Sequence, residues 1–172
     1  MKTRPLISKE LAGFLESGLS HTVASRDGEL RTDAARACAV RISPDRTRLT
    51  LYIHRPNAAA VLRNLKIHGE IAVCVDRPSD SHSCQLKGRF VASRPARADE
   101  RAEVQRQAEG FRAELEAIGI PRIMTAGWPQ WPCVAVAMEV TAIFEQTPGP
   151  GAGDPLPAET LPGGPLAPEA AP

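Results

Sequence analysis

The chain has 172 residues, which suits one domain with a hydrophobic core, and its hydrophobic (42%) and charged (24%) contents are ordinary for a soluble globular protein. The net charge is +1, with about +6 carried by residues 1–122 and −5 by the rest. This surplus is too sparse for a nucleic-acid-binding surface and favours a small anionic ligand. No apolar run approaches the roughly 18 residues of a transmembrane helix, and the N-terminus lacks the apolar core of a signal peptide, so we expect a cytoplasmic protein that does not bind membranes.

Four cysteines and four histidines are scattered along the chain. No pair of cysteines has Cys-x-x-Cys spacing, and no cysteines or histidines cluster as the ligands of a zinc site do. The cysteines, which all lie in strand-like stretches, are Cys38, Cys74, Cys84 and Cys133. We therefore expect reduced, buried thiols and no metal.

The first expected elements are a short helix and a β-hairpin. Ser8 can cap a helix that runs to about Ser17 and ends at Gly18. Asp27-Gly28, between two strand-like stretches, is a strong turn signal. In the second strand, Arg36 and Arg41 would lie on opposite faces because they are five positions apart, and an odd offset changes the face of a strand. Only a β-bulge would aim both arginines at one ligand.

The remaining elements alternate between strands and helices. A strand over residues 48–54 leads into a short helix, for which Asn57 is the expected N-cap. Residues 70–76 predict a buried strand, and residues 84–93 predict another, in which Gly88 indicates a bulge or a close contact. Residues 98–118 predict a polar helix, and residues 133–146 predict a long closing strand.

This order predicts a mostly β protein: a small six-stranded antiparallel β-barrel with peripheral helices, over residues 1–146. Residues 147–172 contain eight prolines and five glycines, a composition that predicts a disordered or polyproline-like tail and not a second domain.

Four local patterns add to this order of elements: GLSHTVASRDGEL (18–30), RACAVR (36–41), LTLYIH followed by a helix and NLKIHGEIAVCV (49–54 and 64–75), and SCQLKGRF (83–90). With them, the sequence resembles the pyridoxamine 5′-phosphate oxidase-like family of FMN-binding split β-barrels, from about Ile7 to Glu145. No single pattern is diagnostic, and the specificity lies in their order and spacing. The resemblance implies a homodimer with FMN in a groove between the subunits.

The resemblance also implies a set of cofactor-binding residues. Arg36 and Arg41 would hold the FMN phosphate, since a planar guanidinium can bind two phosphate oxygens at once. Tyr52 and Ile53 would offer backbone groups beside the flavin ring. The other implied contacts are Ser83 or Gln85 from the partner subunit, Trp131 before the last strand, and Arg55 and Asn57 at the start of the short helix.

The short helix departs from the family pattern. Where the family commonly has a Ser-Arg-Lys-like step, this chain has Ala59, Ala60 and Val61, so both helix-borne cations are absent. The loss of two charge-assisted hydrogen bonds would weaken phosphate binding by about 3–6 kcal/mol. Arg55 and the free N–H groups of the helix would compensate only in part.

The sequence does not identify a substrate or catalytic residues. Pyridoxamine-phosphate oxidase activity proper is not expected, because it usually needs an Arg-x-His-like pair near the C-terminus and no arginine follows Arg122. Trp128 and Trp131 flank Pro129 in a loop and predict an interface, with the dimer seam as its expected place. Three hypotheses remain: an FMN-dependent oxidoreductase acting on a small molecule, a non-catalytic dimeric module that binds flavin or haem, and a dimer whose groove is empty.

Overall fold

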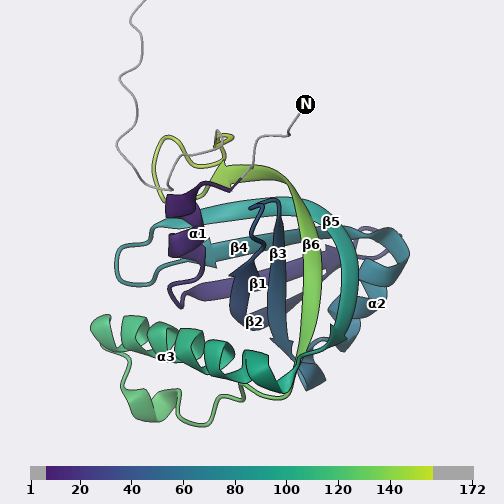
Figure 1. The fold of residues 1–172 in the computed structure, drawn as a ribbon. Helices are drawn as coiled ribbons and strands as arrows, with labels where there is room; N and C mark the ends of the chain where they lie inside the picture. The colour runs from purple at the N-terminus through teal and green to yellow at the C-terminus, as the bar shows by residue number, and fades with distance from the viewer. Residues whose placement is uncertain (1–6, 157–172) are drawn as a thin grey trace, which may run out of the picture.

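The computed structural model describes residues 7–156. Six strands form a closed barrel in the order β1-β2-β3-β6-β5-β4, and every neighbouring pair is antiparallel (Figure 1). The strands are β1 (Ser20–Arg26), β2 (Thr32–Ile42), β3 (Arg48–His54), β4 (Glu70–Asp76), β5 (Ser83–Pro95) and β6 (Cys133–Glu145). The α-helices are α1 (Lys9–Leu15), α2 (Ala59–His68) and α3 (Arg101–Ala117). The predicted antiparallel barrel with peripheral helices is confirmed.

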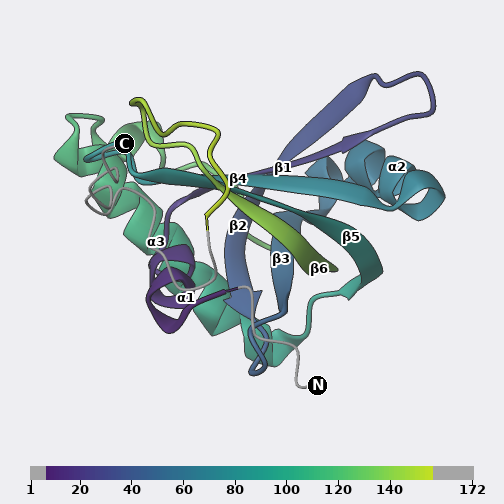
Figure 2. The same cartoon turned by 90° about the horizontal axis from the view of Figure 1, so that it is seen from above.

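The helices pack on the outside of the barrel. Helix α2 contacts β1 and β2, and α3 runs along the outer face of β2. The β1–β2 hairpin projects beyond the barrel (Figure 2). No helix within residues 7–156 is both long and apolar enough to cross a membrane.

Alternating side chains of the strands fill the barrel, as the period of two predicts. Leu49, Leu51 and Ile53 of β3 are all 0–1% exposed and belong to this core. A second, smaller cluster lies outside the barrel, between the sheet and α3. Its buried members are Ala39, Tyr52, Val104, Cys133 and Ala135.

A β-bulge interrupts the alternation in β2. The register with β3 shifts between Ala37 and Ala39, which leaves Cys38 as the extra residue. Beyond the bulge, Val40 faces the barrel core and Ala39 faces the outer cluster. Strict alternation through residue 42 was therefore wrong, and the bulge brings Arg36 and Arg41 to the same outer face.

Gly88 is required where β5 crosses close to β6. A Cβ at this position would lie 2.0 Å from the carbonyl oxygen of Glu139, and the β5–β6 register shifts between Lys87 and Gly88. The predicted bulge and close backbone approach are thus confirmed.

Two predicted helix starts need correction. Asn57 is not the cap of α2: it ends a 3₁₀ turn (Arg55–Asn57), and Ala58 stands at the N-cap without a side-chain hydrogen bond. Another 3₁₀ turn (Ala98–Glu100) precedes α3, and a third (Arg122–Met124) follows it. The first turn of α1 behaves as expected, since Ser8 accepts a hydrogen bond from the Leu11 N–H at 3.0 Å.

The described part of the chain continues past residue 146, where the tail was expected to begin. Residues 147–156 turn back onto the barrel, where the Leu156 N–H donates to the Ile143 carbonyl at 2.8 Å and the Leu156 side chain packs on the core. Further hydrogen bonds hold the segment, among them the one from the Gly153 N–H to the Glu145 carbonyl at 2.7 Å and the one from the Glu145 N–H to the Asp154 carbonyl at 2.9 Å. Residues 157–172 of the predicted tail lie outside the described residues.

Candidate functional site

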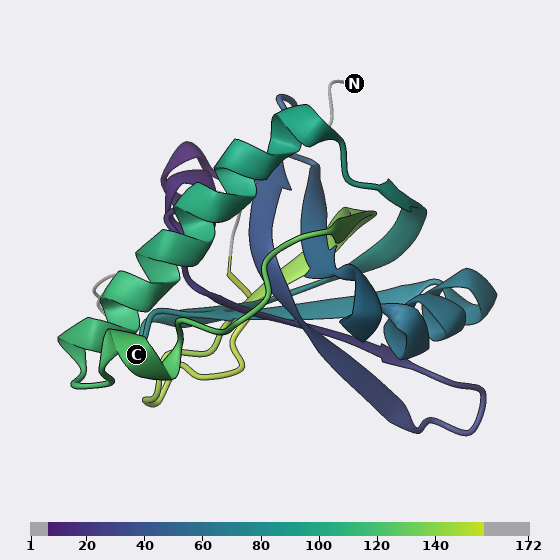
Figure 3. The same cartoon turned by 90° about the horizontal axis from the view of Figure 1, so that it is seen from below.

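A pocket of about 400 Å³ lies between the outer face of β2, the end of β3, α3 and the loop that precedes β6. Figure 3 shows the segment after α3 turning back along the helix to reach β6. We call this cavity the Arg36 pocket. It is lined by Arg36, Cys38, His54, Asn57, Ala108, Phe111, Arg112, Trp128, Pro129 and Gln130.

Arg36 is the principal charge of this pocket. Its guanidinium carbon lies 3.9 Å from the ring centre of Phe111 and 4.8 Å from that of Trp128, and the two rings are stacked. Its Nε is buried and has no hydrogen-bond partner. Burial lowers the pKa of Arg36, and nearby Arg112 lowers it further. Aromatic faces therefore hold the guanidinium in place while one of its donors stays unpaired.

Two further groups add to the polar character of the pocket. The Nδ1 atom of His54 is also buried without a hydrogen-bond partner. Arg112, whose side chain is 18% exposed, lies 3.6 Å from Glu109 and donates to the Thr125 carbonyl at 3.3 Å. Of the described residues that line the pocket, none is acidic. The pocket is therefore cationic, with aromatic walls.

Arg41 and Tyr52 belong to a different site, a buried ionic cluster around Glu100. The Glu100 side chain is 1% exposed, and it accepts hydrogen bonds from the Tyr52 hydroxyl at 2.9 Å and from Arg94 at 2.6 and 2.8 Å. Arg41 lies 3.6 Å from the same carboxylate. The pKa of Glu100 is lowered to about 2, and the hydrogen bonds from Arg94 are the largest cause of this shift. Burial and the bond to Glu100 raise the pKa of Tyr52 to about 12.

The structure separates the other predicted contacts. The side chain of Ile53 is fully buried inside the barrel, and β3 is paired with β2 and β6 on its two edges. Arg55 is exposed on the 3₁₀ turn and does not line the pocket, whereas Asn57 does. Trp131 is half-buried, with the Arg101 guanidinium 5.9 Å from its ring centre. A flavin role for these residues stays a prediction.

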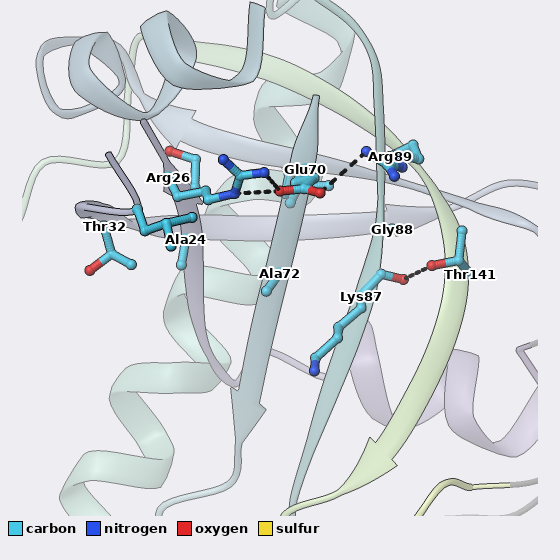
Figure 4. Close-up of a pocket in the computed structure, with 12 residues that line it drawn as sticks. Ala24, Arg26, Thr32, Glu70, Ala72, Lys87, Gly88, Arg89 and Thr141 are labelled. Atoms are coloured by element: carbon cyan, nitrogen blue, oxygen red, sulfur yellow. Dashed lines mark hydrogen bonds and ion pairs between the residues drawn. The ribbon is translucent and has the colours of Figure 1, made fainter. Parts of the chain in front are cut away.

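Ser83 and Gln85 lie on β5, away from the Arg36 pocket, and their proposed contact with a partner's flavin also stays a prediction. A second hollow, of about 540 Å³, lies further along β5, at Lys87, Gly88 and Arg89. We call it the open face, because its lining comes from strands and the β1–β2 hairpin and from no described helix. Figure 4 shows Ala24, Ala72 and Lys87 on it, with Glu70 bridging Arg26 and Arg89 along one side (2.5 and 3.6 Å).

Several pocket residues were not foreseen as site residues. Cys38 was expected to be a buried thiol, and Phe111 lies in the polar helix predicted over residues 98–118. Arg112 and His54 carried no signal in the sequence, because both reach the pocket only through the packing of α3 and the end of β3. Within residues 7–156, no three His, Cys, Asp or Glu side chains gather as metal ligands.

We compared the sequence and the fold with those of known proteins. No family model and no curated protein matches the sequence. Among solved structures, HupZ from Group A Streptococcus superposes with a TM-score of 0.51 at 14% identity, over 86% of this chain and 99% of that chain. An F420 reductase superposes with a TM-score of 0.50 at 13% identity, over 80% of this chain and 98% of that chain.

A pyridoxamine 5′-phosphate oxidase-related, FMN-binding protein from Nostoc punctiforme is also similar, with a TM-score of 0.43 at 12% identity over 81% of this chain and 82% of that chain. Identities this low establish the architecture and not the activity. The chain therefore has the predicted split β-barrel architecture with peripheral helices, and it shares this fold with HupZ and the F420 reductase.

Proposed function

We propose that the protein binds FMN through the Arg36 pocket and acts as a flavin-dependent oxidoreductase on a small molecule. One observation carries the cofactor proposal. Within residues 7–156, three buried polar side-chain atoms lack a hydrogen-bond partner, and two of them, Arg36 Nε and His54 Nδ1, belong to residues that line this one cavity. Buried polar groups in native proteins are nearly always paired, so two unpaired ones in residues that line the same cavity point to a ligand.

The charge of the pocket favours an anionic ligand. Arg36 and Arg112 both line the pocket and repel each other, and no described lining residue is acidic, so a phosphate would stabilise the pair. These two arginines supply cations near the start of α2, where the family's helix-borne cations are absent. The residues present thus fit a phosphate-bearing cofactor, with Arg112 in the supporting role that the sequence assigned to Arg41 or Arg55.

The remaining pocket residues support a planar cofactor. Phe111 and Trp128 hold the Arg36 guanidinium in one orientation, which lowers the entropy cost of binding an anion. Trp128 and Pro129 cover the pocket from the loop side and would exclude water from it. A bound flavin would itself supply hydride and electron transfer, so these residues need only bind, orient and shield it.

Titration of the apoprotein tests the phosphate contact. Arg36→Met should weaken FMN binding by about 1.5–3 kcal/mol, the contribution of a charge-assisted hydrogen bond, and should leave riboflavin binding nearly unchanged. Fluorescence titration with both ligands measures this difference, because riboflavin lacks only the phosphate.

Arg41→Met is the matched control for that titration. It removes an arginine from the same face of β2, but one that Glu100 already engages, so FMN affinity should stay within about twofold. If FMN and riboflavin bind the unmodified protein equally well, Arg36 is not a phosphate anchor. A Soret band in place of flavin absorption in the purified protein would favour the haem-binding alternative.

We also propose a homodimer that buries the open face. This hollow is lined mainly by small and apolar side chains around Ala24 and Ala72, with a rim of charges, an anatomy typical of protein interfaces. Leu30, 70% exposed on the projecting hairpin, adds apolar surface beside it. Gln85 lies next to this face on β5, which is where a contact from a partner subunit would have to originate.

The dimer proposal predicts that Ala72→Glu produces a monomer. Ala72 pairs with Lys87 on β5, so the new carboxylate has a cation beside it and the single barrel tolerates the change. A dimer, however, would have to bury the added charge. Light scattering at micromolar concentration measures the mass, with Ala113→Glu on the exposed side of α3 as the charge-matched control. A monomeric unmodified protein would overturn the proposal.

A further inference from the structure

The loop between α3 and β6 forms one wall of the Arg36 pocket. Figure 3 shows this segment turning back along α3, and its residues Trp128, Pro129 and Gln130 line the cavity. We call residues 121–131 the 121–131 loop. Most of its residues are exposed, and only Thr125 is buried. One wall of the pocket is therefore a solvent-exposed loop, whereas the other walls belong to a helix and two strands.

The backbone of the 121–131 loop is not hydrogen-bonded to the barrel. Within the described part of the chain, its backbone hydrogen bonds join loop residues to one another, as in the bond from the Trp128 N–H to the Thr125 carbonyl at 3.1 Å. The bond to the rest of the molecule comes one residue later, where the Arg55 N–H donates to the Pro132 carbonyl at 2.9 Å. Segments with exposed backbone and few buried contacts open locally at low cost in free energy. The loop can therefore move without breaking a strand pair.

Side chains hold the loop against α3, and Arg112 makes the first of these contacts. Its Nη2 donates to the Thr125 carbonyl at 3.3 Å. The side-chain oxygen of Gln130, with the amide oriented toward the guanidinium, accepts from Arg112 Nη1 at 2.6 Å. One arginine of α3 thus joins the middle and the end of the loop.

Arg122 makes the second contact, from the loop back to α3. It donates to Glu116 at 2.9 Å and also pairs with Glu109. The Arg122 side chain is 48% exposed and does not line the Arg36 pocket. Because exposed ion pairs contribute little, this contact can break and re-form readily.

Gly127 lies between the buried Thr125 and the pocket wall at Trp128. A Cβ at Gly127 would meet no atom within 4 Å, so packing does not require a glycine there. A glycine gives the backbone more conformational freedom than any other residue does. The centre of the loop is therefore the place where its backbone can bend most easily.

We propose that the 121–131 loop is a lid, which swings away from α3 to admit a ligand to the Arg36 pocket and closes behind it. Opening needs to break only the contacts of Arg112 and Arg122 and to separate Trp128 from Phe111, on which it stacks. The proposal rests on the proposed function only for the identity of the ligand, FMN. Because a ligand enters and leaves through the same opening, a looser lid should speed association and dissociation alike.

Hydrogen exchange of the full chain without ligand tests the opening of the lid. The amides of Met124, Thr125 and Trp128, which are bonded within the loop, should exchange faster than those at the centre of β6. Arg122→Met should speed their exchange about threefold, as expected for the loss of an exposed ion pair. Arg106→Met is the matched control. It removes another exposed arginine of α3, one that pairs with Glu103 at 2.6 Å, and loop exchange should stay unchanged.

Stopped-flow fluorescence with FMN tests whether the ligand passes this lid. Arg122→Met should raise the association and dissociation rates about threefold each, so that Kd stays within about twofold. Gly127→Ala should lower both rates about twofold, because alanine fits the space but restricts the backbone. Since neither residue lines the pocket, a change in these rates cannot come from a lost contact with the ligand. Arg106→Met should again match the unmodified protein.

Two results would overturn the lid. One is unchanged loop exchange in Arg122→Met, and the other is an FMN association rate that does not follow the exchange rate across the variants. The exchange measurement needs no ligand, so it decides about the lid even in a chain that fails to bind FMN. Failure of the cofactor proposal, by contrast, is read from the Arg36→Met titration, and the two failures can be told apart.

Discussion

Glu100→Leu should lower the free energy of unfolding by about 3 kcal/mol, the low end of the range for breaking a buried ion pair. The leucine would leave the buried Tyr52 hydroxyl without its acceptor and remove both bonds from Arg94. The loss is at the low end because Arg94 and Arg41 are 40% and 41% exposed, so water can solvate them. Urea unfolding followed by circular dichroism measures the difference.

Asp99→Leu provides the matched control for Glu100. Asp99 is the neighbouring carboxylate, 71% exposed, and it pairs with Arg97 at 3.2 Å. Because exposed ion pairs contribute little, this change should cost less than about 1 kcal/mol. Similar losses in the two variants would contradict the assignment of Glu100 as the centre that joins α3 to β3 and β5.

Acidification from pH 6.5 to 4 should lower the free energy of unfolding by roughly 3 kcal/mol through His21 alone. His21 is fully buried, with its Nε2 2.9 Å from the Leu15 carbonyl, and burial lowers its pKa from 6.5 to about 4. Below pH 6.5 the unfolded chain takes up a proton at this histidine that the folded chain does not, so stability falls with pH. Glu100, whose pKa is about 2, adds a further loss from pH 4.5 to 2.

His21→Gln identifies the histidine's share of this pH dependence. Glutamine keeps an N–H donor that can reach the Leu15 carbonyl, but it does not titrate. Denaturant unfolding at a series of pH values should therefore show a flatter profile between pH 6.5 and 4 than the unmodified protein does. An unchanged profile in the variant would show that other groups govern acid unfolding.

Much of the fold could be predicted because local signals agreed with one another. Asp27-Gly28 does fall in the turn of a hairpin, Ser8 does cap α1, and Gly88 does lie at a close strand crossing. The errors occurred where tertiary contacts outweighed local preference. Asparagine is a common capping residue, yet Asn57 ends a 3₁₀ turn, and residues 147–156 bond and pack to the barrel although their composition predicts disorder.

The candidate site was only partly predictable. Arg36 and Asn57 line the pocket, whereas Arg41, which the sequence could not distinguish from Arg36, pairs with Glu100. A buried carboxylate 59 residues away decides which arginine is available, and no local pattern contains that information. Arg112 enters the pocket for a similar reason, because the packing of α3 across β2 brings it beside Arg36.

The sequence by itself determined the order of the strands and helices, the alternation of core residues along the strands, and the small residue needed where two strands cross closely. These features depend on neighbours within a few positions of the chain. The tertiary structure alone decided which polar groups remain unpaired and which of the two arginines of β2 lines the pocket. Pairing depends on distances between residues that are far apart in the chain, and in the Arg36 pocket these distances follow from one bulge and one helix. The bulge in β2 places Cys38 in the pocket beside Arg36, and α3 closes the pocket with Phe111 and Arg112.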